Sequence, residues 1–121
     1  MQISVVITVT GEMLGAAMCS AVEGGSTYWC SDILIPEEIA DKYTHWYYDE
    51  KFWEEETCGF DVTDAEEGKI ITVTRTAIAK GVKIMAEKYP DHFNDMVKME
   101  GDANTGDVLL QCMTFGEVVY G

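Results

Sequence analysis

Residues 69–90 read KIITVTRTAIAKGVKIMAEKYP and hold a strand, a helix cap and a helix in one run. The β-branched residues at 70–73 predict a strand. Thr74 follows it, and its hydroxyl can accept hydrogen bonds from the free amides of a first helical turn. The apolar residues after it have the spacing of one helix face: Ile78, Gly81, Val82, Met85 and Ala86. Pro90 cannot continue a helix, so we expect this one to end near Lys88.

The same pattern occurs near the start of the sequence. Residues 6–10 read VITVT and echo IITVT at residues 70–74. Thr10 is a candidate helix cap, as Thr74 is. The apolar residues after Thr10 again share one helix face: Leu14, Ala17, Met18, Ala21 and Val22. Any unit of strand, cap and helix has this form, so the echo reflects either local rules alone or an ancient duplication.

Turn and helix signals predict the elements between these two units. Gly24 and Gly25 form a natural helix end. The aromatic and β-branched residues at 27–35 indicate a strand. Pro36 breaks that strand and can open a short helix that reaches Tyr43, with acidic residues near its positive end.

The elements that flank residues 69–88 follow from the same signals. Residues 56–62 are expected to form a strand that pairs with residues 70–73 through an acidic turn at 64–68. Pro90 suits the start of another short helix, which we expect to run through Met99.

The last element predicted is a helix capped by Thr105 after a loop at 101–106. Together the elements indicate an α+β fold, with a small antiparallel or mixed sheet packed against three to four helices. The sequence has 121 residues, of which 47% are hydrophobic. These values fit a single domain that spans residues 1–121.

The apolar runs and the cysteines indicate the compartment. No run reaches the roughly 18 apolar residues that a membrane span needs. The first residues also lack the basic start of a secretory signal. The four cysteines form no CxxC pair; they are Cys19, Cys30, Cys58 and Cys112. We therefore expect a cytoplasmic protein with reduced, buried thiols, and two disulfides if the chain is exported.

Negative charge is concentrated in residues 37–67. This segment holds twelve of the 22 acidic residues and two of the eight basic residues, in a chain of formal net charge −14. Seven aromatic residues lie among the carboxylates: Tyr43, Trp46, Tyr47, Tyr48, Phe52, Trp53 and Phe60. Such a surface attracts a basic partner and repels nucleic acid and anionic membranes. The alternative is a solvated face that only keeps the protein soluble.

The sequence contains residue types that bind metals or act as nucleophiles, but not in the spacing of known metal-binding or catalytic motifs. Structural zinc sites usually pair ligands about two to four residues apart, and no such pair occurs. Asp102, Asn104 and Asp107 resemble a calcium loop, but Met113 stands where that loop needs Glu. No local motif supports Cys58 as a nucleophile with either histidine, and there is no phosphate-binding Gly-rich loop. We therefore expect no enzyme activity, no catalytic residues, no metal and no cofactor.

Two stretches carry a resemblance to a group of proteins. Residues 24–30 (GGSTYWC) have the form GG-x-x-Y-W-C, and residues 107–121 (DVLLQCMTFGEVVYG) end in F-G-E-V-V-Y-G. With ITVT and AIAKGVKIMAEKYPDHF between them, they resemble small acidic proteins of phages, prophages and other mobile elements. That resemblance implies a setting in which such proteins block host defence by occupying the nucleic-acid grooves of CRISPR effectors or restriction enzymes. The resemblance implies no catalytic residue in this chain.

Composition and resemblance together predict an anti-defence inhibitor, with an anti-CRISPR role as first choice. Its partner would be a host protein with a basic nucleic-acid-binding groove, met in the host cytoplasm, and in the sharper form the acidic face mimics DNA. The residues expected at the interface are Asp49, Glu50, Glu54, Glu55, Glu56, Glu66 and Glu67, with Trp46, Tyr47, Tyr48 and Trp53 as anchors or core. The alternative is a self-associating structural module, a homo-oligomer joined through the FGEVVYG tail or the aromatic segment.

Overall fold

Three strands form one antiparallel sheet in the computed structural model, which describes residues 1–121. They are β1 (Cys30–Leu34), β2 (Phe60–Asp64) and β3 (Lys69–Val73), in the order β1-β2-β3. The predicted hairpin of β2 and β3 is confirmed, and its register pairs Phe60 with Val73 and Asp64 with Lys69. Both β1 and β2 begin three or four residues later than predicted, because tight turns precede them.

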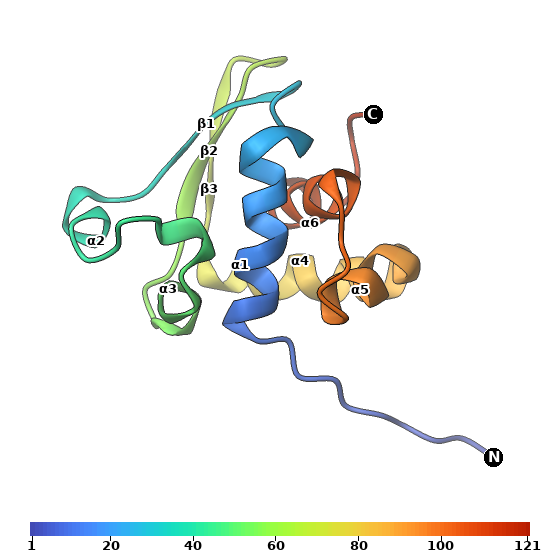
Figure 1. The fold of residues 1–121 in the computed structure, drawn as a ribbon. Helices are drawn as coiled ribbons and strands as arrows, with labels where there is room; N and C mark the ends of the chain where they lie inside the picture. Colours follow the sequence, from blue (N-terminus) through green and yellow to red (C-terminus); the bar gives the residue numbers. More distant parts are fainter.

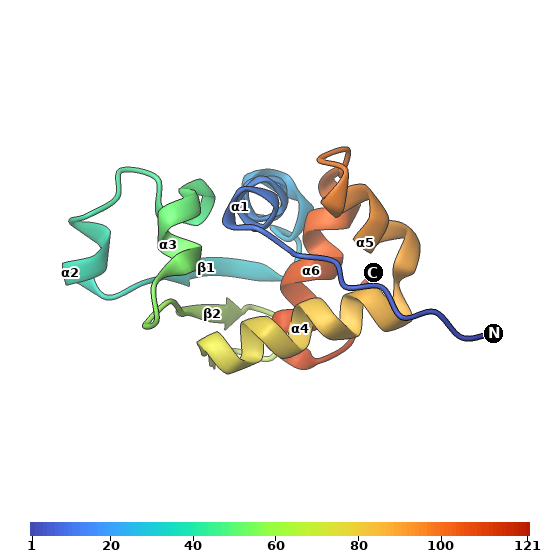
Figure 2. The same cartoon turned by 90° about the horizontal axis from the view of Figure 1, so that it is seen from below.

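Six α-helices accompany the sheet, and the predicted α+β class is confirmed. They are α1 (Gly11–Ser20), α2 (Glu37–Ala40), α3 (Glu50–Glu54), α4 (Arg75–Lys88), α5 (Pro90–Val97) and α6 (Ala103–Phe115). A π-helical turn, η1 (Ala21–Gly25), extends α1, and a 3-10 turn, η2 (Trp46–Tyr48), precedes α3. Figure 1 shows α1, α4, α5 and α6 packed together, and Figure 2 shows α3 beside α1, with α2 farther out on that side. None of these helices has the length and apolar character needed to cross a membrane.

The predicted cap of α6 is wrong, because the helix begins earlier than Thr105. Asp102 is the cap, and its carboxylate accepts from the amide of Thr105 at 3.0 Å. The Thr105 hydroxyl accepts from the Asp102 amide at 3.2 Å in return. This reciprocal capping box satisfies two free amides at once, so the helix starts at Ala103 and the predicted loop at 101–106 is shorter.

Two glycines allow other segments to approach α6 closely. A Cβ on Gly106 would lie 2.5 Å from the carbonyl oxygen of Ala17, so α1 and α6 could not cross as they do. A Cβ on Gly25 would collide with the carbonyl of Ala103. The second glycine of the GG-x-x-Y-W-C motif therefore holds η1 against the start of α6.

The hydrophobic core is one cluster of 20 buried residues drawn from the sheet and the helices. Trp29 is completely buried, although it precedes β1 rather than lying within a strand. Its ring packs at 5.2 Å from that of Phe115 and 5.7 Å from that of Tyr120. The core therefore joins the first motif to the C-terminal tail.

The predicted strand at residues 6–10 is wrong, because residues 1–10 form no regular element. The predicted cap is confirmed, since Thr10 accepts from the amide of Met13 at 3.3 Å and α1 begins at Gly11. Figure 1 shows the preceding residues leaving the body in the direction away from the sheet. A strand needs a neighbour for its hydrogen bonds, so β propensity alone does not make residues 6–10 a strand.

Candidate functional site

The structure divides the predicted acidic surface between two places. Five of its carboxylates lie on α3 or beside it; we call these the α3 cluster: Asp49, Glu50, Glu54, Glu55 and Glu56. Glu66 and Glu67 lie in the turn between β2 and β3, which we call the hairpin tip. Figure 1 shows α3 near one end of β2 and the hairpin tip at the other. The seven predicted carboxylates therefore do not form one continuous surface.

The sequence around α3 explains which of its side chains face solvent. Asp49 caps the helix by accepting from the amide of Lys51 at 3.0 Å. Phe52 and Trp53 are buried at 0% and 6% exposure and fix the inner face of this short helix. Glu50 and Glu54 are consequently exposed. The negative charge of Glu50 also lies favourably at the positive end of the helix.

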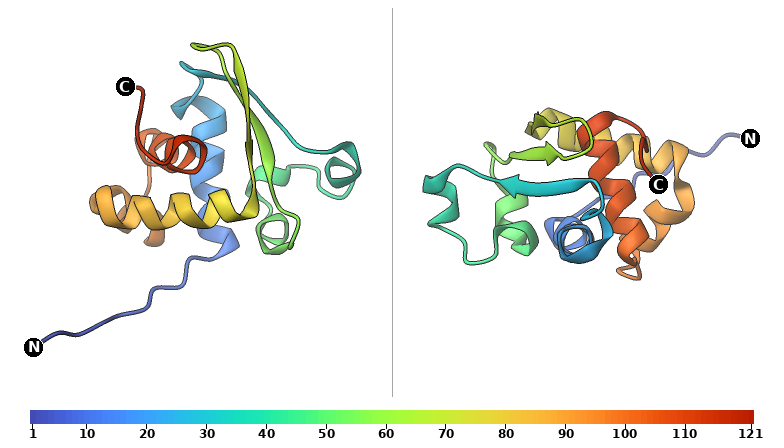
Figure 3. Two further views of the ribbon diagram at one scale, coloured as in Figure 1. Left: turned by 180° about the vertical axis from the view of Figure 1, so that it is seen from behind. Right: turned by 90° about the horizontal axis from the view of Figure 1, so that it is seen from above.

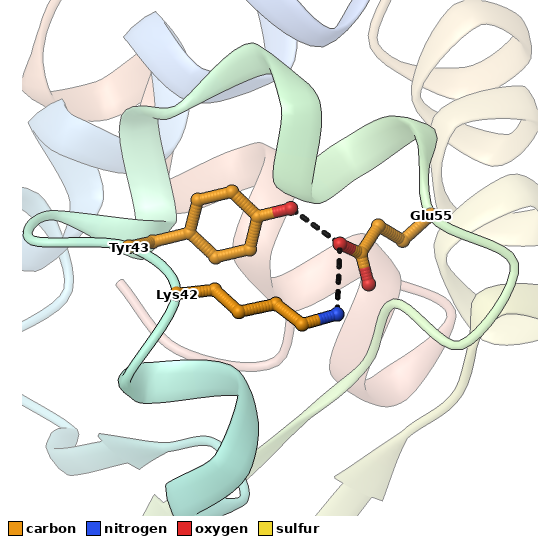
Figure 4. Close-up of polar contacts among 3 residues, drawn as sticks. All are labelled: Lys42, Tyr43 and Glu55. Carbon is orange, nitrogen blue, oxygen red and sulfur yellow. Dashed lines mark hydrogen bonds and ion pairs between the residues drawn. The ribbon is translucent and has the colours of Figure 1, made fainter.

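Glu55 is committed to contacts within the chain. Figure 4 shows its carboxylate between the Tyr43 hydroxyl, which donates a hydrogen bond to it, and the Lys42 ammonium at 3.7 Å. The bond to Glu55, followed by burial, raises the pKa of Tyr43 to about 12. Arg75 also donates to the Glu55 backbone carbonyl. Glu55 thus holds the segment after α2 against the end of α3. Binding a partner through this carboxylate would compete with these internal contacts.

The other glutamates of the α3 cluster have no internal partner. Glu50, Glu54 and Glu56 are exposed, and no hydrogen bond or ion pair of their side chains is present. The single salt bridge in the whole chain is the one between Lys42 and Glu55. These three carboxylates therefore remain available to a cation from outside the molecule.

Of the four predicted aromatic residues, only Tyr48 is exposed. It is 48% accessible and stacks on His45 at 5.2 Å. Trp53 is core, with its indole N–H donating to the Tyr47 carbonyl at 2.9 Å, so it is not an anchor for a partner. Trp46 and Tyr47 are half-buried against the core, with the Trp46 ring 4.9 Å from that of Phe52.

A groove of about 460 Å³ lies beside α3. Tyr43, His45 and Tyr48 supply aromatic lining, Asp49 and Glu50 supply carboxylates, and Lys42, which pairs with Glu55, also lines the groove. An aromatic face within about 6 Å attracts a guanidinium or ammonium, and a carboxylate adds a charge-assisted hydrogen bond. The groove therefore has the chemistry to receive an arginine or lysine side chain.

A buried network around Asp107 was not predicted from the sequence. Asp107 is 8% exposed, and its carboxylate accepts four hydrogen bonds without a cation. The donors are Ser26 Oγ at 2.8 Å, Trp29 Nε1 at 2.8 Å, the Tyr28 hydroxyl at 2.6 Å and Gln111 Nε2 at 3.0 Å. Charge-assisted bonds of this number compensate for the loss of hydration.

Gln111 extends this network to the C-terminal tail and the hairpin tip. Its Oε1 accepts from the amides of Val119 at 2.7 Å and Tyr120 at 2.8 Å. The Tyr120 hydroxyl donates to Asp64 at 2.8 Å, and the amides of Glu66 and Glu67 also donate to Asp64. The two motifs that carry the sequence resemblance thus meet in one hydrogen-bond network.

The tyrosines of the network are stabilised in their neutral form. Burial, and then the bond to Asp107, raises the pKa of Tyr28 to about 12. Burial, and then the bond to Asp64, raises the pKa of Tyr120 to about 12. The sequence analysis considered Asp107 only as part of a calcium loop. Its spacing of four residues from Gln111 puts both side chains on one helix face, and this spacing could have predicted their hydrogen bond. The network therefore links η1, α6, the C-terminal tail and the hairpin tip.

The thiols do not have the properties of nucleophiles. A groove of about 690 Å³ at the end of the sheet includes Cys58 in its lining, but burial raises the pKa of that thiol. Burial likewise raises the pKa of Cys30 and of Cys112 to about 11. The hydrogen bond to Glu23 raises the pKa of Cys19 to about 11. Because the thiolate is the reactive form, these cysteines are weak nucleophiles at neutral pH.

No group of three or more His, Cys, Asp and Glu side chains is arranged to hold a metal ion. All four cysteines are unpaired, with Cys30, Cys58 and Cys112 buried and Cys19 half-buried. Comparison of the chain with known protein families, with curated proteins and with solved structures found no match.

Proposed function

We propose that this chain is a phage-type anti-defence inhibitor, with an anti-CRISPR role as first choice. In this proposal the α3 cluster binds a basic, nucleic-acid-handling host protein in the host cytoplasm. The observation that supports it is the absence of internal counter-charge at Glu50, Glu54 and Glu56. A host protein that binds nucleic acid offers the lysines and arginines that these carboxylates lack.

The distribution of basic residues supports the same proposal. Residues 69–88, which form β3 and α4, hold five of the eight basic residues and one acidic residue. Of these five basic residues, Arg75 contacts the α3 cluster by donating to the Glu55 backbone carbonyl, and none forms an ion pair with its carboxylates. Figure 2 shows α4 extending from there towards α5. The carboxylates of the α3 cluster are therefore not paired with the basic residues of β3 and α4. A one-sided charge of this kind accelerates association with a basic surface and makes the rate depend on salt.

The groove beside α3 supplies a specific contact in addition to charge. We propose that Tyr48 packs against an arginine or lysine of the partner, while Asp49 and Glu50 accept hydrogen bonds from it. Aromatic residues at the centre of an interface often carry much of its binding energy. Duplex DNA carries about one negative charge per 1.7 Å of axis, and a carboxylate array in the same groove competes with it. The α3 cluster itself repels nucleic acid, so we expect no direct binding of nucleic acid.

The resemblance to phage and prophage proteins supplies the setting. Its two motifs have internal roles around Asp107, so they support a common fold rather than a common partner surface. The choice of a defence protein as target therefore depends on that setting and on the charge of the α3 cluster together.

A capture experiment with tagged chain and bacterial host lysate tests this proposal. The variant Glu54→Lys, Glu56→Lys and Tyr48→Ala is expected to lose the captured host protein, because it reverses free carboxylates and removes the anchor. Glu55 is left unchanged, since its contacts with Tyr43 and Lys42 are structural. Capture by the wild type should weaken at high salt, and duplex DNA should compete with it.

The hairpin tip provides the matched control. The variant Glu66→Lys and Glu67→Lys changes the charge by the same amount at a distant place, and it should retain capture. Equal loss in both variants would mean that net charge, rather than the α3 cluster, binds the partner. If the α3 variant captures the host protein as well as the wild type does, the proposed surface is wrong.

The alternative class is a self-associating module. The FGEVVYG tail is the predicted contact, but the Tyr120 hydroxyl donates to Asp64 and the Val119 amide donates to Gln111 of the same chain, which leaves the Val119 side chain 52% exposed. Of the aromatic segment, Tyr48 is the exposed member. Most residues of the tail and of the aromatic segment that were predicted to join two copies therefore make their contacts within one chain.

A further inference from the structure

Residues 3–9 form an extended apolar segment whose last residues contact the body: Val9 packs against the core, and Ile7 and Val9 line a groove beside α4. The residues before them are highly exposed. Ile3 is 76% exposed, Val5 78% and Val6 91%. Figure 3 shows this segment passing beyond the helices and away from the sheet. Apolar side chains of this number and exposure are costly in water, and such patches commonly mark an interaction site.

The same sequence is a strand elsewhere in the chain. Residues 70–74 (IITVT) match residues 6–10 (VITVT), and β3 ends within them. Thr74 caps α4 through the Ala77 amide at 3.2 Å, as Thr10 caps α1. Val73 is 1% exposed because β3 pairs with β2 and packs on the core. The two copies of the pattern therefore have the same cap and differ in whether the strand has a neighbour.

The alternation of residues 3–9 suits a strand with one apolar face. Ile3, Val5, Ile7 and Val9 fall on one side of an extended chain, and Val6 lies between Ser4 and Thr8 on the other. Ile7 and Val9 correspond to Ile71 and Val73 of β3 in the repeat. A segment of this kind pairs readily with an exposed strand edge.

β3 offers such an edge. It has β2 on one side and no strand on the other. Lys69, Ile70 and Thr72 are exposed along it, with Ile70 at 71%. The outer backbone groups of β3 are thus open to another strand.

We propose that residues 3–9 of one copy pair with β3 of a second copy, and that the exchange is reciprocal. Within one chain the segment leaves in the direction away from the sheet (Figure 1), and it would have to reverse at Thr10. The Thr10 side chain and carbonyl are held by the amides of Met13 and Leu14, which opposes that reversal. A second copy brings its edge to the segment without any change in the cap, and reciprocal pairing closes a two-fold dimer.

The distribution of charge along the chain favours this contact over others between two copies. Each chain has a formal net charge of −14, so two copies repel each other over most of their surfaces. Residues 1–10 contain no charged side chain, and residues 69–88 are basic. The contact therefore joins the part of the molecule without carboxylates to the part with excess positive charge. It uses neither the α3 cluster nor the hairpin tip, so it does not rest on the proposed function.

Size-exclusion chromatography with light scattering, over a series of chain concentrations up to millimolar, tests the dimer. The wild type should reach twice the 13.5 kDa mass of one chain. The variant Val6→Pro and Ile7→Pro should stay monomeric with an unchanged circular dichroism spectrum. Adjacent residues of a strand direct their amides to opposite sides, so this pair removes a donor whichever side faces the partner.

The matched control is Val6→Thr and Ile7→Val, which keeps the amides and the β-branched side chains and should dimerise. Hydrogen exchange of the wild type should show slower exchange at residues 3–9 when the concentration rises. A wild type that is monomeric at every concentration would overturn the proposal, as would a dimer that the proline variant retains. A monomer whose segment instead captures a different protein would also overturn it, because the occupant of the edge would not be a second copy.

Discussion

The carboxylates of this chain occupy two contrasting environments. Asp107 and Asp64 are buried at 8% and 1% exposure, and each accepts hydrogen bonds from at least three groups of the chain. Glu54 and Glu56 are exposed and accept none from the chain. The buried pair is committed to the fold, whereas the exposed pair is free for another molecule.

This difference shows why charge density alone does not identify a binding surface. Asp64 belongs to the most acidic segment of the sequence, yet its carboxylate is used by Tyr120 and by the amides of the hairpin tip. Glu55 lies between two free glutamates, and its carboxylate is held by Tyr43 and Lys42. Only hydrogen-bond partners and exposure separate the structural carboxylates from the available ones.

The largest effect is expected from Asp107→Asn. Hydrogen bonds to a charged group contribute about 1.5–3 kcal/mol each, and an amide can accept at only one of its two terminal atoms. Ser26 and Trp29 donate to one oxygen of Asp107, and Tyr28 and Gln111 donate to the other. In the Asn variant one of these two pairs would face the amide NH2 group, which cannot accept a hydrogen bond. We expect the free energy of unfolding to fall by about 2–4 kcal/mol in urea denaturation.

Asp41→Asn is the control for this variant, because Asp41 is exposed and its side chain has no hydrogen bond. Its free energy of unfolding should change by less than about 0.5 kcal/mol. Equal stability of Asp107→Asn and the wild type would mean that the four donors find other partners, and that the contrast between the two environments is not energetic.

Much of the architecture could be predicted from local signals. The helix at Arg75–Lys88, its Thr74 cap and the hairpin of β2 and β3 were predicted because neighbouring residues determine them. The strand at residues 6–10 was wrong although its sequence is almost that of residues 70–74. Local sequence sets the tendency to extend, but pairing depends on a neighbour that the sequence does not place.

The candidate site was predicted only in part, for a similar reason. Glu50, Glu54 and Glu56 are exposed, as a surface requires, but the sequence could not show that Trp53 is core. Asp107 contacts Ser26, Tyr28 and Trp29 across about 80 positions of the chain. Contacts between residues so far apart in the sequence depend on how α6 packs against η1. Local sequence patterns do not predict that packing.

A smaller effect is expected from Tyr120→Phe, and it should depend on pH. The folded pKa of Tyr120 is raised to about 12 from an ordinary value near 10. Its contribution to stability is therefore fully present below about pH 10 and is lost as the pH rises toward 12, because the unfolded chain loses the proton first. The variant should be less stable than the wild type at pH 7, and this difference should shrink between pH 10 and 12.

Urea denaturation of both proteins across this pH range measures the difference. Tyr48→Phe is the control, since Tyr48 is exposed and its hydroxyl has no hydrogen bond in the chain. A gap between Tyr120→Phe and the wild type that stays constant up to pH 12 would show that the bond to Asp64 is not linked to ionisation of the hydroxyl.

The smallest effect on stability is expected from Glu54→Gln with Glu56→Gln. These side chains have no partner to lose, so the free energy of unfolding should change by less than about 0.5 kcal/mol. At low salt the change should even be favourable, because the variant carries less of the negative charge that repels itself, and this gain should disappear as salt screens it. Glu55→Gln is the comparison within the same cluster: it removes the negative charge that Tyr43 and Lys42 contact, so it should be the least stable of the three positions. A loss above about 1 kcal/mol in the double variant would reveal a structural partner for Glu54 or Glu56. In that case the exposed carboxylates would belong with Asp64 and Asp107, and the proposed partner surface would lose its main support.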